Sequence, residues 1–247
     1  MSTDRSAVIT GASRGIGGSI ARSLAEQGFG LTITARNSDD LDATVPTLRE
    51  AGARDVVAVA ADMADPDALP GIVETHQAQF GDMSVLVLNA GVGTAGPIAT
   101  YSLARLDKTF AVNFRAPYQL VQAALPSLRT AASRHPQYGS RVIVVASITG
   151  VFAEAGLAAY GASKAAALSL TDAINSEESS AGVLATAIAP GYVDTDMSGW
   201  IRDRIPASSM IPTEDIATIV GALTRLSPRS TIGRIIMTRA GTDGYRA

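Results

Sequence analysis

The sequence contains no cysteine, and it has only two histidines and one tryptophan among its 247 residues. Without cysteine the chain has no disulfide bond, no thiolate nucleophile and no cysteine-based metal site. The histidines, His76 and His135, are far apart in the sequence, and we expect packing or surface roles for both. We therefore predict no metal site, and any catalysis has to use other side chains.

Long hydrophobic runs are also absent. The most apolar stretch, residues 85–99, is interrupted by glycines, an asparagine and a proline, and no run approaches the roughly 18 residues of a membrane span. The net charge is −3 with both signs mixed along the chain, which argues against nucleic acid or a membrane as partner. Because an apolar strand pattern already begins at Ser6, a signal peptide has no room, and we expect a soluble, cytoplasmic protein.

Short apolar runs alternate with longer helical patterns along the whole chain. A length of 247 residues, 47% of them apolar, suits one large α/β domain. Strands covered on both faces are expected at residues 7–10, 30–35, 55–60, 85–88, 141–146, 183–188 and 234–237. Helices are expected at residues 15–27, 39–51, 67–80, 103–129, 158–181 and 212–226. This alternation predicts a single α/β domain, residues 1–247, with a doubly wound Rossmann fold: a seven-stranded parallel sheet with helices on both faces.

A glycine-rich turn follows the first predicted strand. Gly11, Gly15 and Gly17 stand between this strand and the first predicted helix. Glycines at such a junction let backbone N–H groups approach a pyrophosphate in front of the helix N-terminus. Glycine also serves ordinary tight turns, but its position at the first strand–helix junction indicates a dinucleotide site.

The end of the second predicted strand indicates which dinucleotide binds. Enzymes that use NAD place an acidic residue about 20 residues beyond the glycine turn, where it holds the ribose 2′-hydroxyl. Here the position is Ala35, followed by Arg36, whose guanidinium suits a 2′-phosphate, with Arg14 as a second partner. Asp39 and Asp40 fit the first turn of the next helix better than a ribose site. We therefore expect NADP(H) rather than NAD(H), the alternative being that both arginines are merely solvated.

Tyr160 and Lys164 lie four residues apart, and Ser147 precedes the tyrosine by thirteen residues. Residues at positions i and i+4 share one helix face, so the phenol and the ammonium are expected to line one cavity. A cation beside a phenol lowers the pKa of the phenol, which can then exchange a proton with a substrate oxygen near neutral pH. Lys108 is the only other lysine in an arginine-rich chain, which makes a lysine at position 164 notable.

With further motifs, these residues resemble the short-chain dehydrogenase/reductase family over nearly the whole chain. So many matches in the right order do not arise by coincidence. In chain order the matching residues are the cofactor loop from Thr10 to Gly17, Asp62 and Met63 after the third strand, Asn89, Ala90 and Gly91 after the fourth, then Asn113, Ser147, Tyr160 and Lys164, and finally Pro190, Gly191, Val193, Thr195 and Met197.

The resemblance implies an NADP(H)-dependent oxidoreductase that transfers hydride between the nicotinamide and a carbonyl or secondary alcohol. It implies that Ser147 hydrogen-bonds the substrate oxygen and that Tyr160 gives or takes its proton. Lys164 would lower the pKa of Tyr160 and hold the nicotinamide ribose, and Asn113 would order a water that links Lys164 to solvent. The residues assigned to the cofactor are Gly11, Ser13, Arg14, Gly15, Ile16, Gly17, Arg36, Asp62, Met63, Asn89, Ala90, Gly91, Tyr160, Lys164, Pro190, Gly191, Val193 and Thr195.

Two features depart from the family pattern. Leu88 replaces the first asparagine of an Asn-Asn-Ala-Gly segment, which changes packing under the cofactor and removes a polar group on the nicotinamide side. The tail from Met237 to Gly241 lacks the usual acidic residue followed by two glycines, which affects C-terminal packing and any subunit contact there. Neither departure touches the four residues expected to be catalytic.

The substrate is expected among three segments, residues 93–97, 148–157 and 192–211. The third segment contains Trp200 with glycine and prolines, and it is predicted to be a mobile lid, as in the family. Trp200 suits a pocket wall and a packing anchor within the lid equally well. The bulky side chains of these segments suggest an apolar pocket: Phe152, Leu157, Tyr192, Trp200 and Ile201.

The substrate and the partners stay open. An acyl carrier protein is a candidate partner if the chain is a 3-oxoacyl-[acyl-carrier-protein] reductase, and Arg129 and Arg134 would then face it unless they are simply solvated. In the family, the helices at residues 103–129 and 158–181 build a homodimer or homotetramer. A second hypothesis is a non-catalytic NADP(H)-binding regulatory protein, against which the four retained site residues argue. A third is a nucleotide-sugar enzyme, which the short segment after the last strand disfavours.

Overall fold

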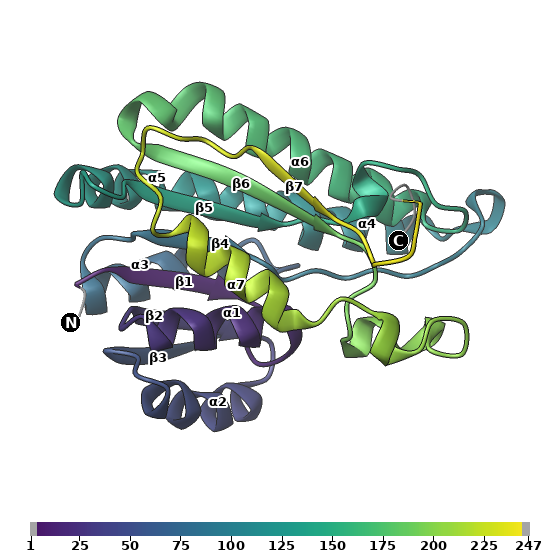
Figure 1. Ribbon diagram of the computed structural model, residues 1–247, viewed down its shortest axis with the longest axis horizontal. Helices are drawn as coiled ribbons and strands as arrows, with labels where there is room; N and C mark the ends of the chain where they lie inside the picture. Colours follow the sequence, from purple (N-terminus) through teal and green to yellow (C-terminus); the bar gives the residue numbers. More distant parts are fainter. Residues whose placement is uncertain (1–3, 244–247) are drawn as a thin grey trace.

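The computed structural model describes residues 4–243, so residues 1–3 and 244–247 of the predicted domain lie outside the described part. Its centre is one sheet of seven parallel strands in the order β3-β2-β1-β4-β5-β6-β7 (Figure 1). The predicted Rossmann fold is confirmed, and each strand lies within two residues of its expected bounds. The strands are β1 (Ser6–Thr10), β2 (Gly30–Ala35), β3 (Asp55–Ala60), β4 (Val85–Leu88), β5 (Ser140–Val145), β6 (Val183–Pro190) and β7 (Arg234–Met237).

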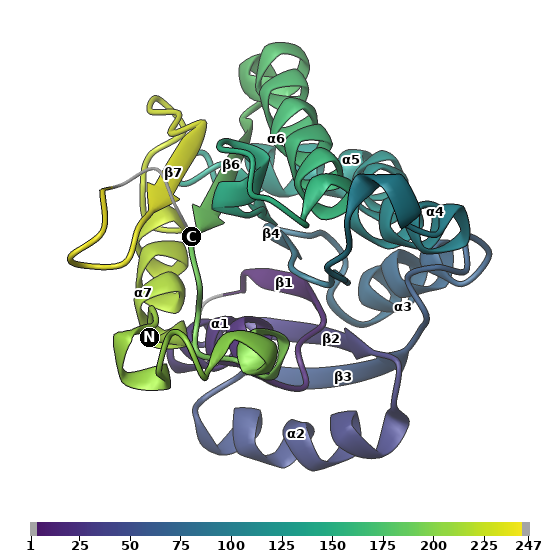
Figure 2. The same cartoon turned by 90° about the vertical axis from the view of Figure 1, so that its right-hand side faces the viewer.

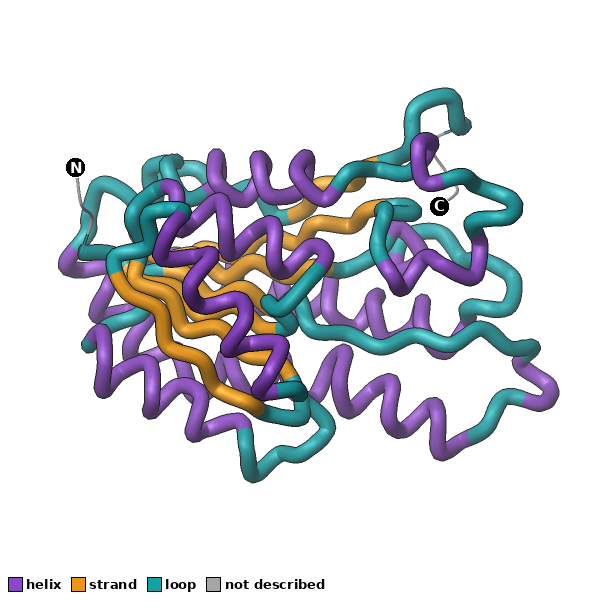
Figure 3. Tube along the Cα trace, turned by 90° about the horizontal axis from the view of Figure 1, so that it is seen from below, coloured by secondary structure: helices purple, strands orange, loops and turns teal. Residues whose placement is uncertain are grey.

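Helices cover both faces of the sheet (Figure 2). One layer contains α1 (Gly15–Glu26), α2 (Ser38–Glu50) and α7 (Thr213–Leu223), and the other contains α3 (Leu69–Phe80), α4 (Leu103–Phe110), α5 (Ala116–Arg134) and α6 (Ala158–Glu178). Successive strand residues point to opposite faces, so Val8 joins one buried cluster and Ile9 the other. The strands are therefore apolar throughout, and Figure 3 shows them enclosed between helices. None of the described helices is both long and apolar enough to cross a membrane.

One predicted helix is divided in the structure. The pattern at residues 103–129 predicted a continuous helix, but the chain forms α4, then a π-helical turn η2 (Ala111–Arg115), and then α5, which continues to Arg134. Pro117 has no N–H to donate to the carbonyl of Asn113 four residues earlier, so a regular α-helix is interrupted here. The wider turn contains Asn113, and such turns are frequent at functional sites.

The connection order places a candidate ligand site at the carboxyl ends of β1 and β4. From β1 the chain passes to β2 and β3 on one side, and it then returns to β4 on the other side of β1. In a doubly wound sheet, ligands bind where the strand order reverses in this way. The strand arrows in Figure 1 point towards residues 192–211, which form the short helices η5 (Asp196–Ile201) and η6 (Ala207–Ser209).

Candidate active site

The glycine turn after β1 has the backbone shape that its sequence predicts. Gly11 and Gly15 have φ angles of +66° and +55°, which L side chains rarely adopt. A Cβ atom at Gly17 would overlap the carbonyl oxygen of Gly11 and come within 2.5 Å of Asn89 Nδ2. The helix α1 then begins without a side-chain cap and without an acidic residue in its first turn. Its first N–H groups are therefore available to an anion such as a pyrophosphate.

Thr10 and Asn89 fasten this turn to the end of β4. Thr10 Oγ1 accepts hydrogen bonds from the backbone nitrogens of Asn89 at 2.9 Å and Ala90 at 3.0 Å. Asn89 Nδ2 donates to the carbonyls of Thr10 at 2.9 Å and Gly11 at 3.0 Å. The Asn89 amide, which the sequence assigned to the cofactor, thus shapes the loop itself. Leu88 is buried in the core, in line with a change in packing.

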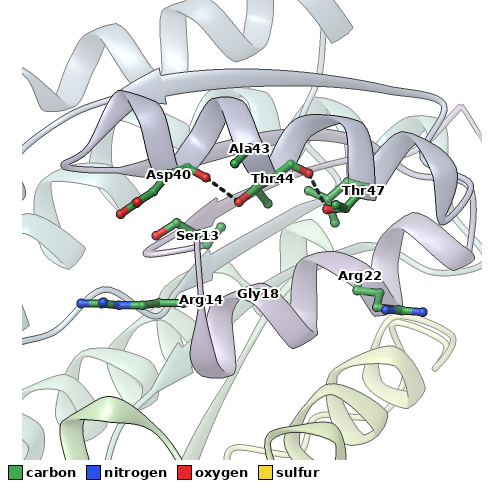
Figure 4. A pocket seen from close by; sticks show the side chains of 10 residues that line it. Ser13, Arg14, Gly18, Arg22, Asp40, Ala43, Thr44 and Thr47 are labelled. Atoms are coloured by element: carbon green, nitrogen blue, oxygen red, sulfur yellow. Dashed lines mark hydrogen bonds between the residues drawn. The ribbon is translucent and has the colours of Figure 1, made fainter.

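The end of β2 and the start of α2 form the other side of the turn. Arg36 follows the last residue of β2 and is exposed. Asp39 and Asp40 lie in the first turn of α2, as predicted, and Asn37 Oδ1 caps that helix by accepting from Asp39 N at 2.9 Å. Ser13, Arg14 and Asp40 line a cavity of about 440 Å³ that runs between α1 and α2 (Figure 4).

Arg14 contacts the segment of residues 192–211. Its guanidinium pairs with Asp196 at 3.3 Å, and both side chains are largely exposed, 70% and 73%. An exposed ion pair of this kind contributes little to stability, so Arg14 can readily exchange Asp196 for another anion. Thr195 also reaches the glycine turn, because its Cγ2 lies 3.4 Å from the position of a Cβ at Gly15. The turn therefore has residues 192–211 directly beside it.

The remaining residues expected at the cofactor follow the ends of β3 and β6. Asp62 is exposed and Met63 is buried just after β3, and Asp62 Oδ1 accepts from Ala64 N at 2.9 Å. Pro190 ends β6, and Gly191 N donates to the carbonyl of Met237 at 2.8 Å. Val193, which is bridged to Ile211, and Thr195 follow farther along the same segment. Ile16 lies in the first turn of α1 and packs against the core.

Ser147 and Tyr160 come together beyond the end of β5. Ser147 caps the short helix η3 (Ile148–Gly150), and its Oγ accepts from Thr149 Oγ1 at 2.9 Å. Burial raises the pKa of Tyr160, and a hydrogen bond with Ser147 opposes this effect only in part. The predicted lowering of this pKa is therefore wrong for this arrangement, because removing the phenol from water outweighs the other effects on it.

Lys164 lies one turn farther along α6 and is buried. Its Nζ donates to the carbonyl of Val145 at 2.8 Å and lies 5.7 Å from the centre of the Tyr160 ring. Burial lowers the pKa of this lysine from 10.5 to about 8. The ammonium thus lies close to the phenol ring, as the i, i+4 spacing predicted. Gly91 lies close by, since a Cβ there would be 3.3 Å from Asn113 Oδ1 and 3.4 Å from Lys164 Nζ.

Asn113 is also buried, and its side chain holds two other elements. Its Oδ1 accepts from Val92 N at 2.9 Å, and its Nδ2 donates to Val92 O at 2.8 Å and to Ser163 Oγ at 2.9 Å. The amide therefore clamps the loop after β4 against α6, next to Lys164. These contacts make Asn113 a positioning residue, and the water-ordering role that the family resemblance implies stays a prediction.

The three segments expected around the substrate meet at this place. A Cβ atom at Gly93 would come within 2.8 Å of the Tyr160 ring. Gly96 N donates to Gly156 O at 2.8 Å. The hydroxyl of Tyr192 donates to Glu154 Oε1 at 2.9 Å. Sequence reasoning missed this carboxylate among the three segments, although Glu154 is the one acidic residue between Ser147 and Tyr160.

Trp200 packs beside this pair without being enclosed. Its ring meets the Tyr192 ring edge-on at 6.0 Å, and 55% of the residue remains exposed. Ile201 and Met210 are buried in the same segment. The segment is anchored by these two residues, and Trp200 stays at its surface.

Other polar residues singled out in the sequence lie outside the site. Arg129 pairs with Glu178, and Arg134 pairs with Asp82 at 3.1 Å, so both arginines already have carboxylate partners within the chain. His76 is buried and hydrogen-bonds Ser6 and Thr32, and burial lowers its pKa to about 4. His76 therefore has the packing role expected for it.

Comparison with known proteins identifies the family of the chain. The family model of the short chain dehydrogenases matches residues 5–205. A 3-oxoacyl-[acyl-carrier-protein] reductase of Staphylococcus aureus is 30% identical over 98% of this chain and 99% of its own. The alcohol dehydrogenase of Thermococcus sibiricus, solved with 5-hydroxy-NADP, superposes with a TM-score of 0.86 at 27% identity, covering 98% of each chain. The Brucella melitensis 3-oxoacyl-[acyl-carrier protein] reductase, solved with NAD, gives 0.86 at 25% identity, covering 96% of each chain. The chain therefore belongs to the short-chain dehydrogenase family of oxidoreductases.

Proposed function

We propose that this protein is an NADP(H)-dependent reductase that interconverts carbonyl compounds and secondary alcohols. The observation that carries the proposal is the meeting of Ser147, Tyr160 and the buried Lys164 beyond the end of β5. The dinucleotide supplies or accepts the hydride. The chain supplies the position of the substrate and the proton on its oxygen.

The residues around the glycine turn fit a dinucleotide. Gly11, Gly15 and Gly17 leave room for its pyrophosphate at the N-terminus of α1, and no acidic side chain of that first turn opposes the charge. Arg36 is exposed at the end of β2, where it can pair with a ribose 2′-phosphate. Arg14 would join it by leaving its weak pair with Asp196. The relatives solved with NADP support this choice, and the Brucella relative with NAD makes NAD(H) the alternative.

The raised pKa of Tyr160 suits the reductive direction. A buried phenol keeps its proton at neutral pH, so Tyr160 can donate it to the oxygen of a carbonyl that accepts hydride. Ser147 Oγ lies beside the phenol and would hydrogen-bond the same oxygen. The Lys164 ammonium would stabilise the phenolate that remains, and Asn113 holds the neighbouring loop in place.

The test is the variant Tyr160→Phe, which removes the proton donor but keeps the ring. We expect carbonyl reduction to fall by at least about 100-fold, the usual contribution of a general acid, while NADPH still binds. Steady-state NADPH oxidation and fluorescence titration would measure the two effects. Tyr138→Phe is the control and should keep full activity, because Tyr138 precedes the start of β5, at the end of the strand opposite Ser147, and the change keeps the ring that packs on Arg5. Normal turnover by Tyr160→Phe would refute the mechanism, and absence of turnover by the wild type with tight NADPH binding would favour a regulatory protein.

A second candidate function is the reduction of 3-oxoacyl groups on an acyl carrier protein. The Staphylococcus and Brucella relatives that carry this activity in their names cover almost the whole chain. Arg129 and Arg134 give it no support, since both pair with carboxylates of the chain itself. Faster turnover of carrier-bound 3-oxoacyl groups than of free ketones would establish this function.

We also propose a homodimer or homotetramer formed through α4, α5 and α6. Leu103 and Tyr118 support this, because they are 74% and 52% exposed on α4 and α5. Sedimentation equilibrium would test it, and a monomer at micromolar concentration would contradict it.

A further inference from the structure

The carboxylate of Glu154 is only half satisfied. Its Oε1 accepts the hydroxyl of Tyr192 at 2.9 Å, whereas its Oε2 is buried and has no hydrogen-bond partner in the described part of the chain. A buried carboxylate oxygen without a donor is costly, so such atoms usually have a partner in the working state. Nothing in the cofactor and proton-transfer roles described above uses this oxygen.

The position of Glu154 connects it with the substrate. It lies on the segment between Ser147 and Tyr160, and Tyr192 reaches it from the segment that follows β6. The substrate segment of residues 93–97 is held there as well, because Gly96 N donates to Gly156 O, two residues beyond Glu154. The unpartnered oxygen therefore lies where the three segments around the proposed substrate site converge.

We propose that Glu154 Oε2 accepts a hydrogen bond from a hydroxyl group of the substrate, so that the preferred substrates are hydroxy ketones and the products are diols. The inference rests on the proposed carbonyl reduction and adds the substrate class. An ionised carboxylate can only accept hydrogen bonds, so it discriminates against substrates that offer only ester, thioester or hydrocarbon groups at this point. A site built to bind a hydroxyl rejects the analogue that lacks it, because the protein group is then left unpaired.

The surroundings favour a neutral hydroxyl over an ammonium group. Arg204 and Arg239 both act electrostatically on Tyr192, so positive charge is already present near the carboxylate. Burial and the bond to Glu154 raise the pKa of Tyr192, which keeps its hydroxyl protonated as a donor to Oε1. With Oε1 held by Tyr192, Oε2 is the oxygen of Glu154 that is left for a substrate group.

Matched ketones test the proposal with the purified wild-type protein and NADPH. Each hydroxy ketone is paired with the ketone in which a methyl group replaces the hydroxyl: hydroxyacetone with butan-2-one, 4-hydroxybutan-2-one with pentan-2-one, and 5-hydroxypentan-2-one with hexan-2-one. In at least one pair we expect kcat/KM to favour the hydroxy ketone by about 10- to 100-fold, the effect of a hydrogen bond to a charged group. Aminoacetone provides the ammonium counterpart of hydroxyacetone and should be the poorer substrate.

Variants then assign the preference to the carboxylate. Glu154→Leu should bring the ratio within each pair close to one, mainly through a higher KM for the hydroxy ketone. Glu154→Gln, which keeps an acceptor and the shape, should leave an intermediate ratio, and it carries the test if the leucine variant does not fold. Glu177→Gln changes an exposed acid on α6 and should keep the wild-type ratio.

Three results would overturn the inference alone: plain ketones reduced as well as hydroxy ketones in every pair, a preference that survives both Glu154 variants, or aminoacetone preferred to hydroxyacetone. Failure of the wild type to reduce any ketone would instead overturn the proposed function, and this inference with it.

Discussion

Replacing Lys164 by methionine should stabilise the folded protein while it damages activity. Methionine has a similar unbranched length but carries no charge, so it fits the buried position without the cost of removing an ammonium from water. The sequence offers a matched control in Lys108→Met, because Lys108 is the only other lysine and is exposed on α4.

The magnitude follows from the pKa of Lys164. The difference between 10.5 and about 8 corresponds to about 3 kcal/mol, since one pKa unit is about 1.4 kcal/mol. The methionine variant also loses the hydrogen bond from the charged Lys164 Nζ to Val145 O, which contributes about 1.5 to 3 kcal/mol and offsets much of this gain. The free energy of unfolding should therefore rise by about 1 kcal/mol at pH 7.

The gain in the free energy of unfolding should decrease as the pH rises. The folded chain binds the Lys164 proton more weakly than the unfolded chain does. Below pH 8 the wild type therefore carries the full destabilisation from its buried ammonium. It disappears as the pH rises from about 8 to 10.5, where the unfolded lysine also loses its proton. Above that range the variant should lose its advantage over the wild type.

Urea unfolding of the wild type and both variants at pH 6.5, 8 and 9.5 would measure these differences. Lys108→Met should change the free energy of unfolding by less than about 0.5 kcal/mol at each pH. NADPH oxidation should show that only Lys164→Met loses turnover. A methionine variant less stable than the wild type at pH 6.5, or a gain that does not change with pH, would refute the reasoning from burial.

Two further changes test the cofactor site. Arg36→Ala should weaken NADPH binding by about 10- to 100-fold and NADH binding hardly at all, and Arg229→Ala is an exposed control. Calorimetric titration measures the binding of both cofactors. Equal losses for NADPH and NADH would reject the 2′-phosphate assignment. Gly17→Ala should lower the free energy of unfolding by about 1 to 3 kcal/mol and weaken dinucleotide binding, because its Cβ would overlap the Gly11 carbonyl. Gly71→Ala has open space around its Cβ, and a Gly17→Ala variant as stable as this control would contradict the packing at the turn.

Much of the fold could be predicted because its signals are local. Each strand of the sheet is a short apolar run, since both its faces are covered, and β2, β3, β4 and β7 have the predicted bounds. The glycine turn needs φ angles that glycine adopts easily, so it is also visible in the sequence. Tyr160 and Lys164 share one helix face by their spacing alone.

Other features depend on residues far apart in the sequence. The pairing of Arg14 with Asp196 and the clamp from Asn113 to Ser163 join distant segments, and no local pattern announces them. The interruption before α5 was within reach of the sequence, because Pro117 is visible there, but the helical pattern on both sides concealed it.

The sequence by itself determined the order of strands and helices, the dinucleotide turn and the tyrosine–lysine pair, because each depends on neighbouring residues. Only the tertiary structure decided the pKa shifts of Tyr160 and Lys164 and the partner of Glu154. Burial of Tyr160 reversed the expected direction of its pKa, and Tyr192 approaches Glu154 across 38 residues of chain. Desolvation and hydrogen bonding depend on everything that packs around a group, and a linear sequence does not contain that information locally.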